Sequence, residues 1–278
     1  IAFIGRTETI LCVIWREGMT IPVTTRSDLE EHLSSLGLVT GDNVVVHSRL
    51  ISFGLLEGGA QGAYETIRQI VGPRATIAVP TFRLHASAEL IYDRRTSPSE
   101  RCGQLSEFVR QFEGSHRSRC PLHSFGAIGP DAKILEQPSG NSSMGAGSDF
   151  EVLHKSGFKQ VYLGAEFKEA ATVVAHAMAI FGAVPYRQWL NLRRKALNDN
   201  GDVVDLDCRY YGRIPGENTD EDWSIPQPLL RGAGKLKECK THFGRSYAFM
   251  TDDLMRILVG YLEKKPDGLL AVNRLDHD

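Results

Sequence analysis

The sequence predicts an α/β protein with a mixed, largely parallel central sheet flanked by helices and a small antiparallel subregion. Between residues 40 and 181, short runs of β-branched residues alternate with amphipathic helical segments, which is typical of parallel strands. From 200 to 216 the alternation of polar and apolar residues is that of an antiparallel hairpin. A length of 278 residues suits one such domain. We therefore expect a single domain over 1–278, with 1–26 as an N-terminal extension and about 195–245 as the antiparallel subregion.

The first elements form one strand–helix–strand unit. Residues 27–38 have the apolar spacing of a helix, with a Ser/Asp start and Gly37 as its stop. A turn and a buried strand occupy 40–48, a glycine-rich loop runs into a helix over 52–72, and a second buried strand follows at 74–82. Two strands joined through a helix are expected to pair in parallel with a right-handed crossover.

The remaining elements extend this pattern to the end of the chain. Thr251 is expected to cap the last helix. The N-terminal stretch is expected to form a strand or an extension that packs on the body or on a second subunit, which would suit a homodimer. The expected elements are a helix at 103–114, a strand at 123–129, a capped helix at 148–157, a third buried strand at 159–164, and helices at 170–181 and 251–266.

Composition excludes several classes of function. The net charge of -2 argues against a nucleic-acid partner, because such proteins usually carry a strong basic excess. No run of about 18 apolar residues occurs, so no membrane span is expected, and the N-terminus lacks the pattern of a secretory signal. The five cysteines contain no Cys-x-x-Cys pair, which favours reduced thiols, a cytoplasmic location and no metal site.

Polar groups follow three of the buried strands at the point where each strand ends. They are His47-Ser48-Arg49, Thr81 and the loop after Gly164. The carboxyl ends of parallel strands meet at one edge of the sheet, where ligands bind. The helix that carries His176 leaves the third strand end, so these segments can meet in one place.

Four features leave alternatives open. The glycines at 54, 58, 59 and 62 precede a helix and can hold a phosphate or simply form a tight connection. His47 is either a site residue or a buried, satisfied histidine. Cys120 and His123, in CPLH, could form a catalytic pair, but no third group accompanies them. His176, between alanines in TVVAHAMAIF, is either a base or a core histidine.

The motifs of the chain resemble those of the aminoglycoside 3-N-acetyltransferase family over about residues 27 to 263. The similar segments are VVVHSRLISFGLLEGGAQGAYETIRQIVGPRATIAVPTF, SPSERCGQLSEFVRQFEGSHRSRCPLHSFGAIG, SDFEVLHKSGFKQVYLG, the helix of His176 with VPYR, and GKLKECKTHFGRSYAF. The resemblance implies the antibiotic N-acetyltransferase fold and direct acyl transfer from acetyl-CoA to an amine. It also implies a histidine general base on the helix after the third strand. The base is needed because an amine is protonated at neutral pH and must lose a proton to attack a thioester.

Carried over residue by residue, the resemblance assigns His176 as the base, with Asp93 as the first candidate for its carboxylate partner. The acetyl-CoA side is assigned to His47, Ser48, Arg49, Arg117, Ser118 and Ser124. The amine side is assigned to Thr81, Thr172 and Glu107. Other carboxylates that could serve as the partner are Glu107, Glu166 and Glu169.

This sequence departs from the family pattern at several positions. The family pattern on the helix is Thr-x-x-His-x-x-Glu, and anchoring on VPYR places Ala179 at the glutamate. Anchoring on Thr172 places Ala175 at the histidine and Met178 at the glutamate, so the glutamate is missing in either case. Cys120 stands where the family usually has histidine, and Arg49 replaces a serine.

Three functions remain open. The first is an acetyl-CoA-dependent N-acyltransferase that acts on an amino sugar or aminoglycoside-like amine. The second is an enzyme of the same fold that acylates another biosynthetic substrate. The third is a catalytically altered member that binds CoA or a sugar without turnover. No metal is expected in any of them.

Overall fold

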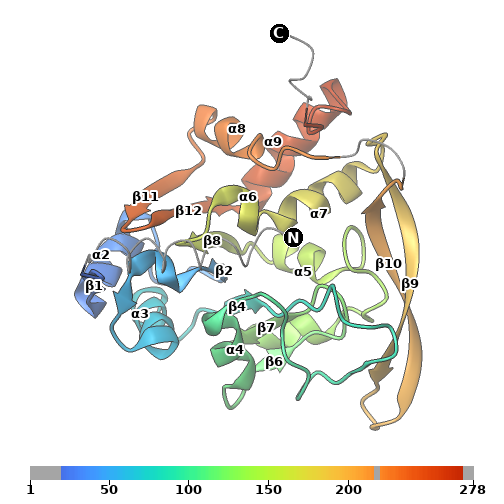
Figure 1. Cartoon of the computed structure of the whole chain (residues 1–278), viewed down its shortest axis with the longest axis horizontal. Coiled ribbons are helices and arrows are strands. Elements are labelled where there is room, and N and C mark those ends of the chain that lie inside the picture. Colours follow the sequence, from blue (N-terminus) through green and yellow to red (C-terminus); the bar gives the residue numbers. More distant parts are fainter. Residues whose placement is uncertain (1–19, 216–219, 272–278) are drawn as a thin grey trace.

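The computed structural model describes residues 20–215 and 220–271 (Figure 1). The expectations for the stretch 1–18 therefore lie outside the described residues. Within the described part, no helix is long and apolar enough to cross a membrane. Nor do these ranges contain a cluster of three or more His, Cys, Asp or Glu side chains that could hold a metal ion.

A seven-stranded mixed sheet forms the centre of the molecule, in the order β11-β12-β8-β2-β4-β7-β6. The central strands β8, β2 and β4 pair in parallel. β12 and β7 flank them in antiparallel orientation, and each is followed by an outer antiparallel strand. Most of the strands thus point the same way, as expected from the sequence. Their bounds are β2 Val44–Ser48, β4 Ile77–Pro80, β6 His116–Arg117, β7 Phe125–Ile128, β8 Lys159–Leu163, β11 Lys237–Thr241 and β12 Gly244–Met250.

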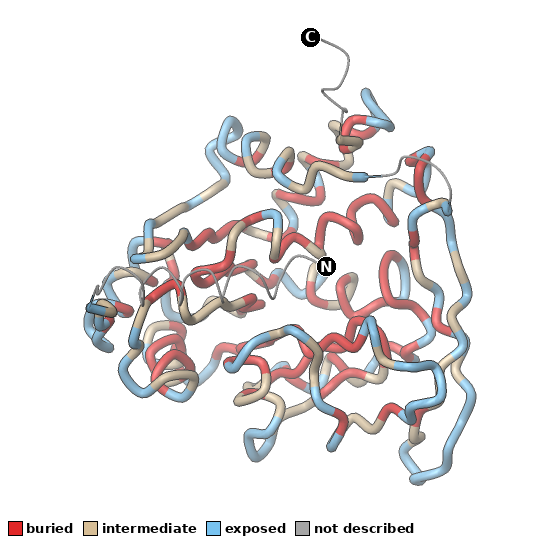
Figure 2. Tube along the Cα trace, viewed as in Figure 1, coloured by how far each residue is buried: buried red, intermediate tan, exposed pale blue. Residues whose placement is uncertain are grey.

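Helices cover both faces of this sheet. Alternate side chains of a strand point to opposite faces, so Val44 and Val46 pack against the first group of helices, whereas Val45 packs against the second. The buried residues form a continuous layer through the centre (Figure 2). The first group is α2 Arg26–Ser35, α3 Gly59–Val71 and α4 Gln104–Gln111, and the second is α5 Asp149–Lys155, α7 Thr172–Phe181 and α9 Thr251–Lys264.

The expected strand–helix–strand unit is confirmed as β2, α3 and β4, with β2 and β4 parallel. The expected helix ends are confirmed in part. The Ser148 hydroxyl accepts a hydrogen bond from the Glu151 amide and caps α5. Thr25 caps α2 in a reciprocal capping box with Asp28. The expectation for Thr251 is wrong, because α9 begins after Met250 and the Thr251 hydroxyl donates to the carbonyl of Phe158 instead.

A long antiparallel hairpin stands beside the sheet at the right of Figure 1. It consists of β9 Arg187–Leu197 and β10 Val203–Arg213, with Trp189 opposite Tyr211, and β5 Ile91–Tyr92 pairs with β9 in parallel. The sequence predicted both arms within 200–216. That range holds only the second arm, because the polar first strand gives little alternation to detect. The smaller elements are β1 Val23–Thr24, β3 Leu55–Leu56, α6 Phe167–Ala170, α8 Pro226–Gly232 and two 3₁₀ turns, Leu50–Phe53 and Ala132–Glu136.

Candidate active site

Three buried imidazoles surround an aromatic pair between the sheet and helices α5 and α7. His47 lies 6.4 Å from Phe82 between ring centroids, and His123 lies 4.9 Å from the same ring. Phe150 of α5 stacks on His176 of α7 at 5.6 Å. Phe82 and Phe150 are in turn 6.2 Å apart. The fold thus brings the end of β2, the CPLH segment and the His176 helix into one cluster.

Unpaired polar atoms gather in this cluster. Nε2 of His47, Nδ1 of His123 and Nε2 of His176 are each buried without a hydrogen-bond partner among the described residues. The Tyr162 hydroxyl, beside His47 on the neighbouring strand, is also buried and unpaired. A buried polar atom without a partner costs about 1–3 kcal/mol, so proteins keep few of them. Their concentration at the carboxyl ends of β2 and β8 supports a site that meets a polar ligand.

His176 is held in one tautomer by a backbone group. The Gly145 amide donates to Nδ1 of His176 at 3.0 Å. Nδ1 is therefore the acceptor nitrogen, and the neutral ring carries its proton on Nε2. Burial lowers the pKa of His176 to about 3, so the ring stays neutral at physiological pH. In this state, Nε2 offers a hydrogen-bond donor rather than a lone pair.

The carboxylate that acts most directly on His176 was missed by sequence reasoning. Besides burial, the charges of His154 and Glu151 on α5 are the influences on the pKa of His176, and Glu151 is the one that raises it. Glu151 accepts from the Gly147 amide and pairs with Lys155 at 2.8 Å. No sequence signal marks it, because α5 and α7 meet only in the fold.

The carboxylates expected near His176 lie elsewhere. Asp93 accepts hydrogen bonds from the Arg95 amide and the Thr96 hydroxyl within its own turn, and these lower its pKa against the effect of burial. Burial would raise the pKa of Glu107 as well, but hydrogen bonds from Arg110 and Ser99 hold it at about 2. Neither carboxylate contacts His176. Glu166 precedes α6, and Glu169 lies 3.9 Å from Arg49.

A buried network joins four of the residues expected to bind ligands. The Arg117 guanidinium donates to the Thr81 hydroxyl and carbonyl and to the Ser124 hydroxyl. The Ser124 hydroxyl donates to the Thr81 carbonyl at 2.6 Å, and the Ser118 hydroxyl accepts from the Phe125 amide. These bonds tie the end of β4 to β6 and β7. The network supports a structural role for these residues, and a direct contact of any of them with acetyl-CoA stays a prediction.

The motif at the end of β2 splits between the two faces of the sheet. His47 faces Tyr162 and the α5–α7 side. Ser48 points the opposite way, and a Cβ on Gly103, just before α4, would lie 3.8 Å from its hydroxyl, which is itself buried and unpaired. Arg49 lies at the end of the strand, and Thr172 opens α7 half-buried. The structure therefore places only His47 of this motif beside the imidazole cluster.

Two further buried groups lie near the cluster. Asp149 is fully buried, and neither of its oxygens has a hydrogen-bond partner by distance and angle among the described residues. Burial raises the pKa of Asp149 to about 7. The sulfur atoms of Cys120 and Cys208 lie 3.9 Å apart, and burial raises the pKa of the Cys120 thiol well above its usual range. This keeps the thiol protonated and does not suit a Cys–His nucleophile with His123.

Comparison with known proteins identifies the family. The model of the family described as aminoglycoside 3-N-acetyltransferase matches residues 45–263. The chain belongs to this family of acetyltransferases. The match includes the imidazole cluster, the buried Arg117 network and the β9–β10 hairpin.

Curated relatives of this family match most of the chain. Aminoglycoside N(3)-acetyltransferase III from Salmonella sp is 29% identical over 269 residues, covering 86% of this chain and 92% of its own. Aminoglycoside N(3)-acetyltransferase VIII from Streptomyces fradiae is 28% identical, covering 88% and 93%. Among solved structures, AAC(3)-Xa has a TM-score of 0.79 at 24% identity, covering 88% of this chain and 95% of its own. AAC-IIIb, solved as a binary complex with CoASH, has a TM-score of 0.76 at 22% identity, covering 88% and 98%. Both structures share the fold.

The indole ring of Trp189 packs against Gly145, the residue whose amide holds His176. A Cβ built on Gly145 would lie 3.1 Å from Cη2 of Trp189 and 3.4 Å from Cβ of Ala179. Gly145 therefore sits between the two, beside His176. The ring of Trp189 and the methyl group of Ala179 thus both lie close to the segment that holds His176.

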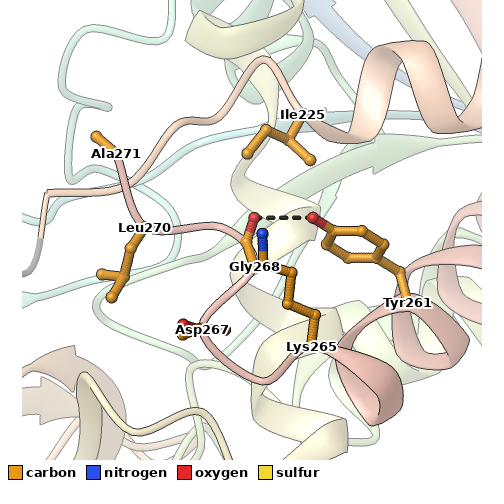
Figure 3. A pocket seen from close by; sticks show the side chains of 7 residues that line it. All are labelled: Ile225, Tyr261, Lys265, Asp267, Gly268, Leu270 and Ala271. Carbon is orange, nitrogen blue, oxygen red and sulfur yellow. Dashed lines mark hydrogen bonds between the residues drawn. The ribbon is translucent and has the colours of Figure 1, made fainter. Parts of the chain in front are cut away.

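A separate pocket of about 370 Å³ lies at the end of α9, away from the cluster (Figure 3). It is bounded by Tyr261, whose hydroxyl donates to the Gly268 carbonyl, and by the charged side chains of Lys265 and Asp267. None of the residues expected to bind substrate or cofactor lines it.

Proposed function

We propose that this protein transfers an acetyl group from acetyl-CoA to an amino group of an amino sugar or aminoglycoside-like acceptor, at the cluster around His176. The observation that carries the proposal is the gathering of unpaired nitrogen and hydroxyl atoms at the carboxyl edge of the parallel strands, in a member of an acetyltransferase family. Acetyl-CoA as the donor is supported by AAC-IIIb, a protein of the same fold that was solved with CoASH.

Acetyl-CoA would supply an activated acyl group, whose carbon bonds to the amine nitrogen as its bond to sulfur breaks. The chain must then do two things: move the proton that the amine loses, and stabilise negative charge on the carbonyl oxygen. His176 is the proposed proton acceptor. Its burial supports this role in one respect, because the ring is neutral at working pH.

The tautomer of His176 restricts its role as a base, because its acceptor nitrogen is already hydrogen-bonded. The lone pair of His176 is on Nδ1 and is engaged by the Gly145 amide. The ring accepts a proton only if this contact opens. Without opening, the Nε2–H group is a donor suited to the carbonyl oxygen, a contribution that typically amounts to about 3 kcal/mol in the transition state. Both roles require neutral His176, and both are lost when the ring is removed.

A second candidate is a family member that binds CoA or a sugar without turnover. Ala179 at the glutamate position and Cys120 at the family's usual histidine favour it. So does the absence of contact between His176 and any of the carboxylates expected from the sequence, as far as the described residues go.

The test is acetyl transfer followed by release of free thiol, with a panel of amino sugars, nucleotide-linked amino sugars and aminoglycosides. His176→Ala is compared with His116→Ala, which removes a histidine paired with Glu136 on the outer strand β6. We expect turnover on at least one amine and a loss of about hundredfold or more in kcat for His176→Ala only. CoA binding by calorimetry with no turnover would favour the binding protein. Absence of CoA binding would refute the proposal.

A further inference from the structure

The β9–β10 hairpin presents a cation close to the segment that holds His176. The guanidinium carbon of Arg209 lies 4.3 Å from the centroid of the Trp189 ring. The same ring reaches Gly145 and Ala179, next to His176. We refer to these two side chains as the Trp189–Arg209 pair. Gly145 therefore connects the pair to the His176 ring, near Ala179, where one alignment with the family pattern places a glutamate.

The backbone of Arg209 is fixed in place. Its amide donates to the Asn141 carbonyl at 2.8 Å, and its carbonyl accepts from the Ser143 amide at 2.9 Å. These bonds continue β10 onto the loop that leads to Gly145. The side chain is thus presented from a rigid segment, which lowers the entropy lost when it binds a ligand.

The guanidinium of Arg209 is exposed and has no carboxylate within ion-pair distance among residues 20–215 and 220–271. The neighbouring carboxylates of the hairpin and its base are engaged elsewhere: Asp207 with Arg193, and Glu221 with Arg187 and Arg213. Apart from its contact with the Trp189 ring, the Arg209 guanidinium makes no hydrogen bond to the residues that the structure describes, so its N–H groups are available to a ligand. Such a planar fork matches the oxygens of a phosphate.

We propose that the Trp189–Arg209 pair binds a phosphate group of the acceptor, so that the substrate is an amino sugar carrying a phosphate or a nucleoside diphosphate. This inference rests on the proposed function, since it names the class of the amine. An aminoglycoside is a polycation, and here it would meet Arg209 without the family's glutamate. A phosphorylated sugar would instead place its charge on Arg209 and its amine toward His176.

The test measures binding by calorimetry with CoA present. The probes are glucosamine, glucosamine 1-phosphate, uridine diphosphate glucosamine and kanamycin. We expect the phosphate-bearing probes to bind about tenfold or more tightly than glucosamine, with Arg209→Gln losing that advantage and Arg209→Lys keeping part of it. Arg193→Gln removes the same charge from an exposed ion pair on the same hairpin and should change nothing. A preference for uridine diphosphate glucosamine over glucosamine 1-phosphate would identify the nucleotide as the source of the phosphate.

Several outcomes would overturn the inference: equal affinity for glucosamine and its phosphates, tightest binding of kanamycin, no binding of any phosphate-bearing probe, or an equal effect of Arg209→Gln on all probes. The proposed function is judged separately by acetyl transfer. Phosphate-dependent binding without acetyl transfer would support the phosphate inference and refute the proposed enzyme activity. Acetyl transfer to kanamycin, unchanged by Arg209→Gln, would support the enzyme activity and refute the phosphate inference.

Discussion

Acidification from pH 7 to pH 5 should weaken the fold because of the buried histidines. Burial lowers the pKa of His47 to about 4 and that of His123 and His176 to about 3, from an ordinary 6.5. In the unfolded chain each ring takes up a proton as the pH falls below 6.5, whereas in the folded chain it does not. The stabilisation from these groups is therefore fully present above pH 6.5, and it is lost as the pH falls toward the pKa of each ring in the folded protein. At pH 5 the loss is just under about 2 kcal/mol per histidine, which amounts to about 5–6 kcal/mol for the three.

The carboxyl group of Asp149 changes the stability in the opposite direction as the pH falls. Burial raises its pKa from 3.8 to about 7, so the folded protein takes up this proton as the pH falls and gains stability. Over the same interval this gain is about 2 kcal/mol, which leaves a net loss of about 3 kcal/mol from these four groups. Burial also lowers the pKa of the half-buried His32 to about 4, which adds to the loss. Urea unfolding at pH 7 and at pH 5 measures the difference directly.

Two substitutions should move this loss in opposite directions. His123→Phe removes one buried imidazole whose Nδ1 has no partner, and should reduce the net loss to about 1 kcal/mol. Asp149→Asn removes the compensating carboxyl and should raise the loss to about 5–6 kcal/mol. If both variants showed the same pH dependence as the unsubstituted protein, the burial argument for these groups would be refuted.

Three further predictions concern the site and its support. Because burial lowers the pKa of His176 to about 3, kcat should show no acid limb near pH 6.5 that depends on this ring; such a limb in the pH profile would mean that His176 is solvated in the working enzyme. Arg187→Met leaves the buried Glu221 carboxylate without its main partner and should lower the free energy of unfolding by about 3–5 kcal/mol. As a control, Arg193→Met breaks an exposed ion pair and should cost about 1 kcal/mol or less. Equal effects of the two variants in urea unfolding would contradict this difference. Gly145→Ala places a methyl group 3.1 Å from Trp189 at a φ of +70° and should displace the amide from His176; unchanged kcat would show that this contact is dispensable.

The sequence was sufficient for the elements that build the sheet. Val44 to Val46 and Val161 to Leu163 are buried on both faces of the sheet, as central parallel strands must be, and both runs lie where expected. Sequence reasoning placed the hairpin too late in the chain, because the charged run Arg193, Arg194 and Lys195 interrupts the alternation of β9. It placed His176 on a helix leaving the third strand, which the structure confirms.

The contacts of the site were less accessible to sequence reasoning. Whether Arg117 faces a ligand or the Thr81 carbonyl depends on the path of two loops, and no local pattern encodes that choice. The proximity of Glu151 to His176 depends on how α5 packs against α7. Asp93 was a reasonable partner by residue type, yet its own turn supplies donors closer than any other element.

The position of β2 in the sheet sets the order in which the protein becomes active. One neighbour of Val44 is Ile77, close in the chain, but the other is Lys159, which is joined only after a loop of more than a hundred residues has closed. Local pairings form sooner than distant ones, because closing a longer loop costs more chain entropy. The N-terminal half can therefore pair β2 with β4 during synthesis, while His47 still lacks Tyr162 beside it. On refolding, we therefore expect the helical signal to return before acetyl transfer activity.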